Sequence, residues 1–217
     1  MSRCVIVGNA GISDYDRLRR ELRPDDFLVV CDGGQRHLAG LRAVPDLIVG
    51  DFDSGTRPET ETETLVLPRE KDDTDTVFAA REAFRRGFRD FLLLGVAGGR
   101  LDHTLGNVYL LLWLDGHGCS ARLLDDYSEM CIVSREAVEV EDSCAFFSLL
   151  NIAGTARGIE ITGAKYPLAD GEIRSDYQYG ISNEVLPGGK ARISLREGSL
   201  LLIRVFRDAY PPAKSGS

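Results

Sequence analysis

The sequence is poor in the residues that build zinc and redox sites. It has only three histidines, and its five cysteines are scattered, without a Cys-x-x-Cys pair. Zinc is normally held by closely spaced cysteines and histidines, so this composition argues against a zinc site. We expect five reduced, structural thiols, as is usual in the cytoplasm. His37 and His117 are isolated, and we expect them to be structural or surface residues.

Several familiar active-site motifs are also missing. The chain has no Gly-x-x-x-x-Gly-Lys-Ser/Thr string, so it is not a P-loop enzyme. Neither Gly-x-Ser-x-Gly nor Gly-x-Gly-x-x-Gly follows an expected strand. This argues against a hydrolase nucleophile elbow and against a dinucleotide fingerprint.

Long apolar segments and excess positive charge are absent too. The longest apolar stretch, Val108–Leu114, is far too short to span a bilayer, and residues 1–8 lack the features of a signal peptide. The net charge of −8 argues against sequence-independent nucleic-acid binding, which needs a basic surface. We therefore expect a cytoplasmic protein with no membrane or nucleic-acid partner. An acidic enzyme can still bind a polyphosphate, because a metal ion and a few basic residues set the local field.

The first half of the chain alternates between strand and helix patterns. Continuous apolar runs indicate strands buried on both faces, as in a parallel sheet, at 3–8, 27–31, 46–50, 64–67 and 91–96. Helical periodicity appears between them, at 14–22, 74–86 and 102–114. The last helix is so apolar in its second half that we expect it to be largely buried. This order predicts a doubly wound α/β domain with a mostly parallel sheet over residues 1–128.

The pattern changes after about residue 125. Turn signals recur every eight to twelve residues, and no stretch shows convincing helical periodicity. Strand-like segments occur at 131–134, 138–140, 144–150, 158–162, 172–175, 191–195 and 199–206. We predict an antiparallel β-sandwich over residues 129–210.

Two acidic strings carry the clearest chemical signal. In the first, Asp51 and Asp53 follow the expected strand 46–50. Residues two apart on an extended chain project to the same side, and ligands bind at the carboxyl ends of strands in open α/β sheets. Carboxylates are hard ligands that suit Mg²⁺ bound to phosphates. The alternative is that one aspartate caps a turn while the other is solvated.

The second acidic string, Lys71-Asp72-Asp73-Thr74-Asp75, lies at the start of the 74–86 helix. A helix N-terminus favours negative charge, so the simpler interpretation is capping by Asp72 or Asp73. Together with the first pair, the string favours a shared metal site that uses Asp75, with Asp72 close by. We expect Asp73 to face solvent.

Two glycine-rich strings suit phosphate binding. Asp32-Gly33-Gly34 follows a strand, and paired glycines allow a backbone to approach a ligand closely, although a tight turn would need them as well. Gly98-Gly99-Arg100 follows the expected strand 91–96 and opens a helix, which combines a guanidinium with helix N-terminal amides. Asp102 in that helix has the alternative role of N-cap, and His103 that of an ordinary first-turn residue.

The motifs in this order and spacing resemble the thiamine pyrophosphokinase family. The resemblance rests on Asp32-Gly33-Gly34, Pro45–Ser54, Lys71-Asp72-x-Thr74-Asp75 and Gly98–Asn107, and it continues through Gly163–Leu168 and Gly180–Glu184. It covers about residues 4–206. The family has an α/β catalytic domain, a β-sandwich, and a homodimer with thiamine sites between subunits. It transfers the pyrophosphoryl group of ATP to thiamine, giving thiamine diphosphate and AMP.

The resemblance also implies roles for individual residues. It implies Mg²⁺ as cofactor, bound by Asp51, Asp53 and Asp75, with Asp32 and Asp72 in support. It also implies nucleotide contacts by Gly33, Gly34, Arg100, Asp102 and Asn107. The implied thiamine contacts are Ser182 and Asn183 of the partner subunit. The chain departs from some relatives in having no aromatic residue just after Asn183, which leaves Tyr166, Tyr177 or Tyr179 as alternatives for stacking on the thiamine ring.

The mechanism predicted from these residues is in-line attack of the thiamine hydroxyl on the β-phosphorus, with positioning and charge neutralisation as the main catalytic effects. Asp32, Asp72 and Arg100 are the candidate catalytic residues, with Asp72 as proton acceptor. Two alternatives remain: a phosphohydrolase that uses Asp51 as nucleophile, and a thiamine- or nucleotide-binding module without catalysis.

Overall fold

The computed structural model describes residues 2–52, 60–68 and 72–208. Asp53, one of the three predicted metal ligands, lies outside these residues. The chain divides into two compact units, unit 1 (Met1–Asp126) and unit 2 (Tyr127–Ser217), whereas the sequence analysis puts the boundary after residue 128. Among the described residues, no helix is both long enough and apolar enough to cross a membrane.

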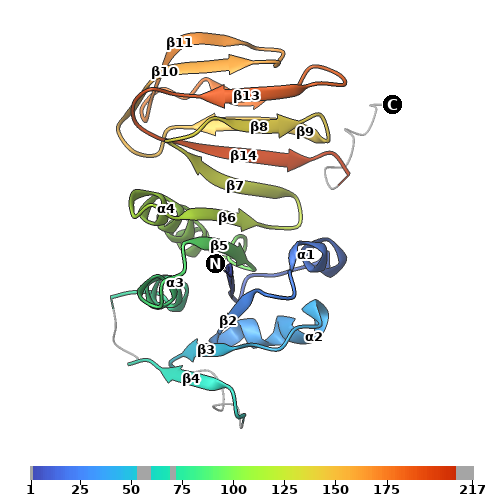
Figure 1. Cartoon of the computed structure of the whole chain (residues 1–217), viewed down its shortest axis with the longest axis vertical. Coiled ribbons are helices and arrows are strands. Elements are labelled where there is room, and N and C mark those ends of the chain that lie inside the picture. Colours follow the sequence, from blue (N-terminus) through green and yellow to red (C-terminus); the bar gives the residue numbers. More distant parts are fainter. Residues whose placement is uncertain (1, 53–59, 69–71, 209–217) are drawn as a thin grey trace. The chain divides into compact units, whose positions relative to one another are not determined.

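The described part of unit 1 is built on a sheet of six parallel strands in the order β6-β5-β1-β2-β3-β4. Helices α1 and α2 lie on one side of this sheet and α3 and α4 on the other (Figure 1). The predicted doubly wound α/β architecture is therefore confirmed. The strands are β1 (Cys4–Val7), β2 (Phe27–Cys31), β3 (Leu47–Gly50), β4 (Glu63–Val66), β5 (Asp90–Leu94) and β6 (Ser120–Leu124). The helices are α1 (Tyr15–Glu21), the 3₁₀ helix η1 (Asp32–His37), α2 (Leu38–Leu41), α3 (Asp75–Arg85) and α4 (Leu101–Gly116).

The central strands follow the sequence prediction, and the departures lie at the margins. Every residue of β1 and β3 is buried, as continuous apolar runs require. The expected burial on both faces is wrong for β4, which is an edge strand with Val66 55% exposed. The sequence analysis also missed β6 and the η1–α2 segment, whose mixed polar and apolar residues show no clear period.

Helix α4 is less buried than its composition suggests. Leu110, Leu111 and Leu114 are buried, but Tyr109 is 55% exposed in the same half of the helix. The expectation that this half is largely buried is therefore only partly correct. A helix can carry apolar side chains on a face that does not pack against the sheet, and composition alone does not show which face packs there.

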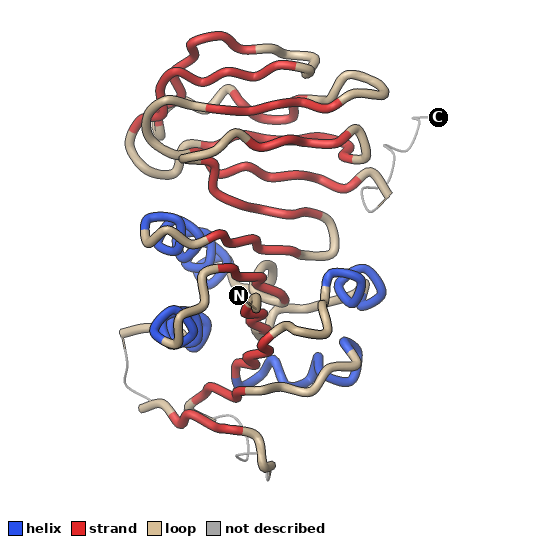
Figure 2. The backbone as a smooth tube through the Cα atoms, viewed as in Figure 1, coloured by secondary structure: helices blue, strands red, loops and turns tan. Residues whose placement is uncertain are grey.

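Unit 2 is a sandwich of two antiparallel sheets, as predicted (Figure 2). Its strands run in the orders β12-β9-β14-β7 and β11-β10-β13-β8, and one apolar core contains residues of both sheets, including Phe147 and Ile193. The strand that the sequence analysis missed is β12. The strands are β7 (Ser128–Val133), β8 (Val138–Glu141), β9 (Cys144–Leu150), β10 (Thr155–Thr162), β11 (Leu168–Arg174), β12 (Gly180–Asn183), β13 (Lys190–Ser194) and β14 (Leu200–Phe206).

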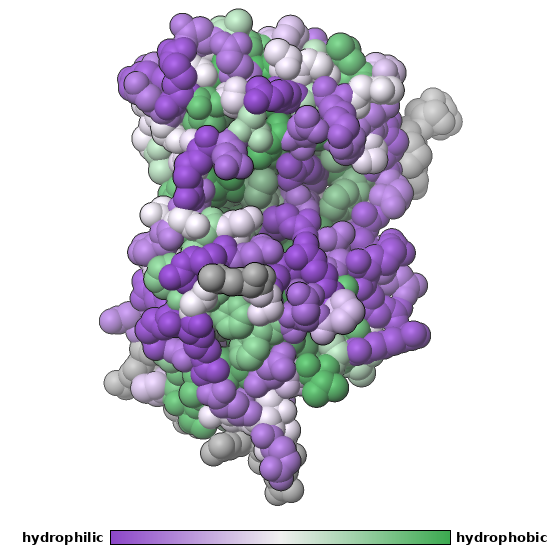
Figure 3. Space-filling view, viewed as in Figure 1, coloured by the Kyte–Doolittle hydropathy of each residue, from purple (hydrophilic) through white to green (hydrophobic). Residues whose placement is uncertain are grey.

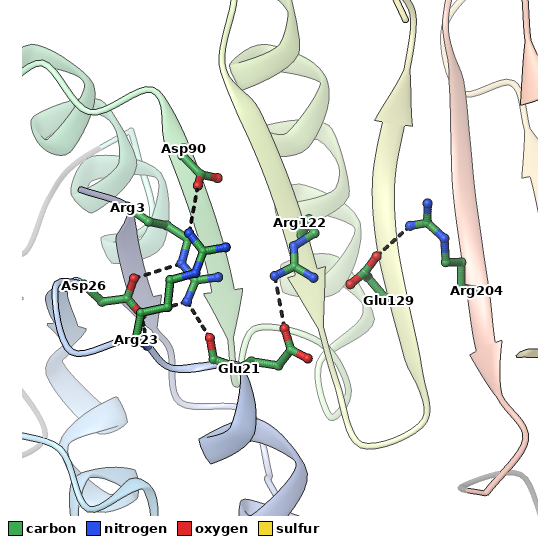
Figure 4. A network of polar contacts seen from close by, with 8 residues as sticks. All are labelled: Arg3, Glu21, Arg23, Asp26, Asp90, Arg122, Glu129 and Arg204. Atoms are coloured by element: carbon green, nitrogen blue, oxygen red, sulfur yellow. Dashed lines mark hydrogen bonds and ion pairs between the residues drawn. The ribbon is translucent and has the colours of Figure 1, made fainter. Parts of the chain in front are cut away.

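The amino-terminal edge of the unit 1 sheet is held by ion pairs (Figure 4). The buried Arg3 forms a two-point contact with Asp26, at 3.0 and 2.7 Å. Nearby, Arg122 reaches Glu21 at 3.1 Å, and Arg23 lies 3.8 Å from Asp90. All parallel strands begin at this edge, so these charges stabilise the end of the sheet that is opposite to the expected ligand site.

Candidate functional site

Unit 1 has a cavity of about 660 Å³ where the carboxyl ends of its parallel strands meet. Its wall comes from segments that follow β1, β2, β3 and β5 and from the first turns of α3 and α4. Parallel topology places consecutive strand ends at one edge, which explains why segments far apart in sequence converge here. The lining residues are Gly8, Asn9, Ala10, Gly11, Cys31, Asp32, Gly33, Arg36, Asp51, Thr74, Asp75, Thr76, Gly95, Val96, Gly98, Gly99, Arg100, His103 and Asn107.

Three predicted carboxylates line this cavity: Asp32, Asp51 and Asp75. The end of β3 packs closely on the first of them, since a Cβ atom added to Gly50 would lie 2.7 Å from the Asp32 Cβ. Among the described residues, no three Asp, Glu, His or Cys side chains lie close enough together to hold a metal ion. The carboxylate oxygens of Asp51 and Asp75 are of the type that Mg²⁺ prefers, and the remaining predicted ligand is the undescribed Asp53.

The start of helix α3 is capped by Thr74. Its Oγ1 accepts a hydrogen bond from the backbone N–H of Val77, at 3.3 Å. Capping by Asp72 or Asp73, the alternative from the sequence, is therefore wrong. Asp73 instead forms an ion pair with Arg81, and Asp75 is the first helical residue, on the cavity wall.

The paired glycines after β2 serve close packing within the protein. A Cβ atom on Gly34 would lie 2.4 Å from the Val7 carbonyl oxygen, and one on Gly33 would lie 2.4 Å from the Asn9 side chain. Gly33 lines the cavity, whereas Gly34 is buried beneath it. These glycines therefore let η1 pack against the loop that follows β1.

The second glycine loop is tied to its own helix. Gly98 and Gly99 adopt φ values of +90° and +68°, which side chains rarely tolerate. Thr104 Oγ1 accepts a hydrogen bond from the Gly98 N–H at 3.0 Å and donates one to the Arg100 carbonyl at 3.1 Å. Nearby, the buried Asn107 donates to the Val96 carbonyl at 2.8 Å. Asn107 therefore both lines the cavity and holds the end of β5.

Arg100 is paired with a neighbour on its own helix. Its guanidinium contacts both carboxylate oxygens of Asp102, and this contact lowers the pKa of Asp102 to about 2. Helix α4 begins at Leu101, with Arg100 in the N-cap position, so the alternative of Asp102 as N-cap is wrong. Arg100 and His103 line the cavity, while the described lining residues do not include Asp102 or Asp72.

Sequence reasoning missed the loop after β1 and the residues that hold it. Ala10 N–H donates to the Gly95 carbonyl at 2.7 Å, and the Ala10 carbonyl lies 2.9 Å from Nε2 of the buried His37. Arg36 donates to the Asn9 carbonyl. The signal was available, because Gly8-Asn9-Ala10-Gly11 follows a buried strand just as Asp32 and Asp51 do.

The predicted thiamine residues lie on β12 in unit 2. Asn183 is buried, and its amide clasps Tyr166: Oδ1 accepts from the Tyr166 N–H at 3.0 Å, and Nδ2 donates to the Tyr166 carbonyl at 2.8 Å. Ser182 is exposed and has φ of +58°. The side chains of Tyr166, Tyr177 and Tyr179 are exposed, and the rings of the last two are 5.7 Å apart.

Comparisons with known proteins identify the family of the chain. The family model for the thiamin pyrophosphokinase catalytic domain matches residues 18–123, and that for the thiamin pyrophosphokinase vitamin B1 binding domain matches residues 135–200. The thiamine pyrophosphokinase of Bacillus subtilis is 29% identical over 181 residues, which covers 80% of this chain and 84% of that protein.

Solved structures are similar over almost the whole chain. The thiamin pyrophosphokinase of Geobacillus thermodenitrificans has a TM-score of 0.80 and 28% identity, with 98% of this chain and 99% of that one covered. The Bacillus subtilis structure has a TM-score of 0.81 at 24% identity, with 95% and 100% covered, and supports the fold. The chain belongs to the thiamine pyrophosphokinase family.

Proposed function

We propose that this chain transfers the pyrophosphoryl group of ATP to the hydroxyl group of thiamine, giving thiamine diphosphate and AMP. The observation that carries the proposal is the cavity of unit 1, where aspartates, arginines and glycine loops from separate strand ends line one space. Both domain models of the family match the chain in the expected order. The enzyme is therefore a thiamine diphosphokinase with thiamine and ATP as substrates.

We propose Mg²⁺ as the cofactor, held by Asp51, Asp75 and Asp53. Bound Mg²⁺ would neutralise phosphate charge and act as a Lewis acid. The support is the hard-donor chemistry of Asp51 and Asp75 and their position on the same cavity wall. Asp32 lines that wall too and packs against Gly50, which favours a role in placing the ligand-bearing loop.

The chain's own residues contribute mainly by positioning. The loop of Gly98 and Gly99 is held by Thr104 and has a fixed, open backbone on the cavity wall, which suits close approach of a phosphate. Phosphoryl-type transfers need little covalent participation by the protein, so this pre-arranged wall accounts for most of the expected rate gain. Asp72 remains our candidate proton acceptor, although it is exposed and is not one of the cavity-lining residues described above.

We propose that the enzyme acts as a homodimer in which β12 of the partner supplies Ser182 to the thiamine. Support comes from the exposed apolar side chains close to Ser182 in sequence, Tyr177, Tyr179 and Ile181, because such clusters commonly mark contact surfaces. Asn183 supports the site by clasping the Tyr166 backbone. Sedimentation at several concentrations tests the dimer, and a monomer at all of them contradicts it.

We also propose that the protein works in the cytoplasm. All five cysteines are free, which is expected in a reducing compartment. Fractionation of cells that express the tagged protein tests this proposal.

The decisive experiment is product analysis with ATP, Mg²⁺ and thiamine. We expect thiamine diphosphate and AMP in equal amounts, detected by chromatography. ADP with thiamine monophosphate would contradict pyrophosphoryl transfer. A covalent phosphate on Asp51, or phosphate release without thiamine, would support the phosphohydrolase alternative. Binding of both substrates without any product would support the non-catalytic binding module.

A further inference from the structure

The cavity of unit 1 needs a positive charge that is available to a phosphate group, and Arg100 is poorly placed to provide it. Two arginines are present among the described lining residues, Arg36 and Arg100. The guanidinium of Arg100 already contacts both carboxylate oxygens of Asp102. Binding a phosphate through Arg100 would therefore mean giving up or sharing this contact.

Arg36 has no such competitor. Its described contacts are a hydrogen bond to the backbone carbonyl of Asn9 and an approach of 3.3 Å between its Nε and His37 Nε2. Within the described ranges, no ion pair with an acidic side chain involves Arg36. Arg36 therefore forms no direct ion pair with a described carboxylate, although Asp32, Asp51 and Asp75 line the same cavity.

The segment that carries Arg36 is firmly held. The next residue, His37, is buried and is bonded on both ring nitrogens, with Tyr15 Oη 2.7 Å from Nδ1 and the Ala10 carbonyl 2.9 Å from Nε2. On the other side of Arg36, Gly34 packs so tightly that an added Cβ would lie 2.4 Å from the Val7 carbonyl oxygen. The backbone that carries Arg36 is therefore fixed, so ligand binding has to order only the side chain itself.

We propose that Arg36 is a nucleotide-binding residue whose guanidinium contacts the phosphate groups of the substrate in this cavity. The proposal rests on the proposed function for the identity of that substrate. A guanidinium offers planar, paired donors that match phosphate oxygens, and it remains charged at any working pH. The guanidinium of Arg100 is already bonded to Asp102, so Arg36 is the better placed of the two arginines for this contact.

The test compares phosphate binding in variants of the full chain, without divalent metal so that the metal site does not contribute. Arg36→Gln, Arg36→Lys and Arg100→Gln are titrated by calorimetry with ATP, with inorganic tripolyphosphate and with adenosine. We expect Arg36→Gln to weaken both phosphate ligands by about 10- to 100-fold, the usual effect of losing a charged hydrogen bond, and Arg36→Lys to weaken them less. Adenosine binding should be unchanged, which excludes a general loss of the cavity's shape.

Arg100→Gln is the matched control, and we expect it to change tripolyphosphate affinity less than Arg36→Gln. Unchanged tripolyphosphate affinity in Arg36→Gln, or a larger loss in Arg100→Gln, would overturn the proposal. With thiamine and Mg²⁺, Arg36→Gln should raise the KM for ATP more than it lowers kcat. Failure of the unaltered protein to form thiamine diphosphate would refute the proposed function alone, because the calorimetric comparison does not depend on turnover.

Discussion

The two units of this protein use their charged residues differently. In unit 1, aspartates and arginines gather around the cavity at the carboxyl ends of the strands. In unit 2, charged side chains pair across neighbouring strands: Lys190 lies 3.1 Å from Glu139 and 2.8 Å from Glu141, and Arg157 lies 2.9 Å from Glu172. On the face drawn in Figure 3, hydrophilic side chains cover much of the surface of each unit, and hydrophobic side chains are dispersed among them.

The difference follows from strand direction. Parallel strands end at one edge, so the loops that follow them bring distant residues together. Antiparallel strands alternate in direction, so their ends are divided between two edges, and oppositely charged residues at paired positions, such as Lys190 and Glu141, stabilise the sheet locally. The comparison predicts that substitutions in unit 1 loops affect function, whereas those in the core and the charged cross-strand pairs of unit 2 affect mainly stability.

The largest expected effect is on the core of unit 2. Phe147 is fully buried in the apolar core of the sandwich, and Phe147→Ala should cost about 3–5 kcal/mol in the free energy of unfolding. Urea unfolding measures the cost, with Leu186→Ala, at an exposed position of the same unit, as control. If the unit 2 core contributes only to stability, the variant still binds ATP under conditions where it is folded. Loss of ATP binding by the folded variant would contradict this difference between the two units.

The second prediction concerns the cavity of unit 1. Asp75→Asn should lower kcat/KM by about 10²- to 10³-fold with little change in unfolding free energy, since it removes a carboxylate ligand of the proposed metal ion. Asp73→Asn is a matched control on the same turn, because Asp73 pairs with Arg81 at the surface. Equal activities of the two variants would contradict the assignment of Asp75 as a metal ligand.

The third prediction concerns the effect of pH on the free energy of unfolding, through His37 of unit 1. Burial lowers the pKa of His37 below its ordinary value of 6.5. The unfolded chain therefore takes up a proton here at a higher pH than the folded chain, so stability is full above pH 6.5 and falls as the pH drops towards the folded pKa. Between pH 8 and pH 5, unfolding free energies should decline more for the unaltered protein than for His37→Gln. Parallel declines would show that His37 does not contribute.

The smallest effect is expected at a surface pair of unit 2. Arg157→Gln removes an exposed cross-strand partner of Glu172 and should cost about 0.2–1 kcal/mol in unfolding free energy, less at high salt. Thiamine and ATP kinetics should not change. A kinetic defect in this variant would mean that the charged pairs of unit 2 are not merely stabilising.

Local pattern was enough to predict much of the architecture. The runs around Ile6, Val29 and Leu93 are apolar without interruption, and only a strand buried on both faces accommodates this. Segments whose structure depends on neighbours were missed. Strand β12 pairs irregularly with β9, and β6 is only partly apolar, so neither has a clear period of its own. The exposure of Tyr109 depends likewise on what covers α4.

For the site, the residue types and their order along the chain were readable from sequence, because Asp and Gly after a buried strand point to a ligand-binding edge. The convergence of Asp32, Asp51 and Asp75 on one cavity was decided by the parallel strand order, which no local pattern encodes. The tertiary structure also determined which arginine is paired. The sequence alone does not show what the guanidinium groups of Arg36 and Arg100 contact. In the folded chain, that of Arg100 contacts the Asp102 carboxylate, whereas that of Arg36 contacts a backbone carbonyl.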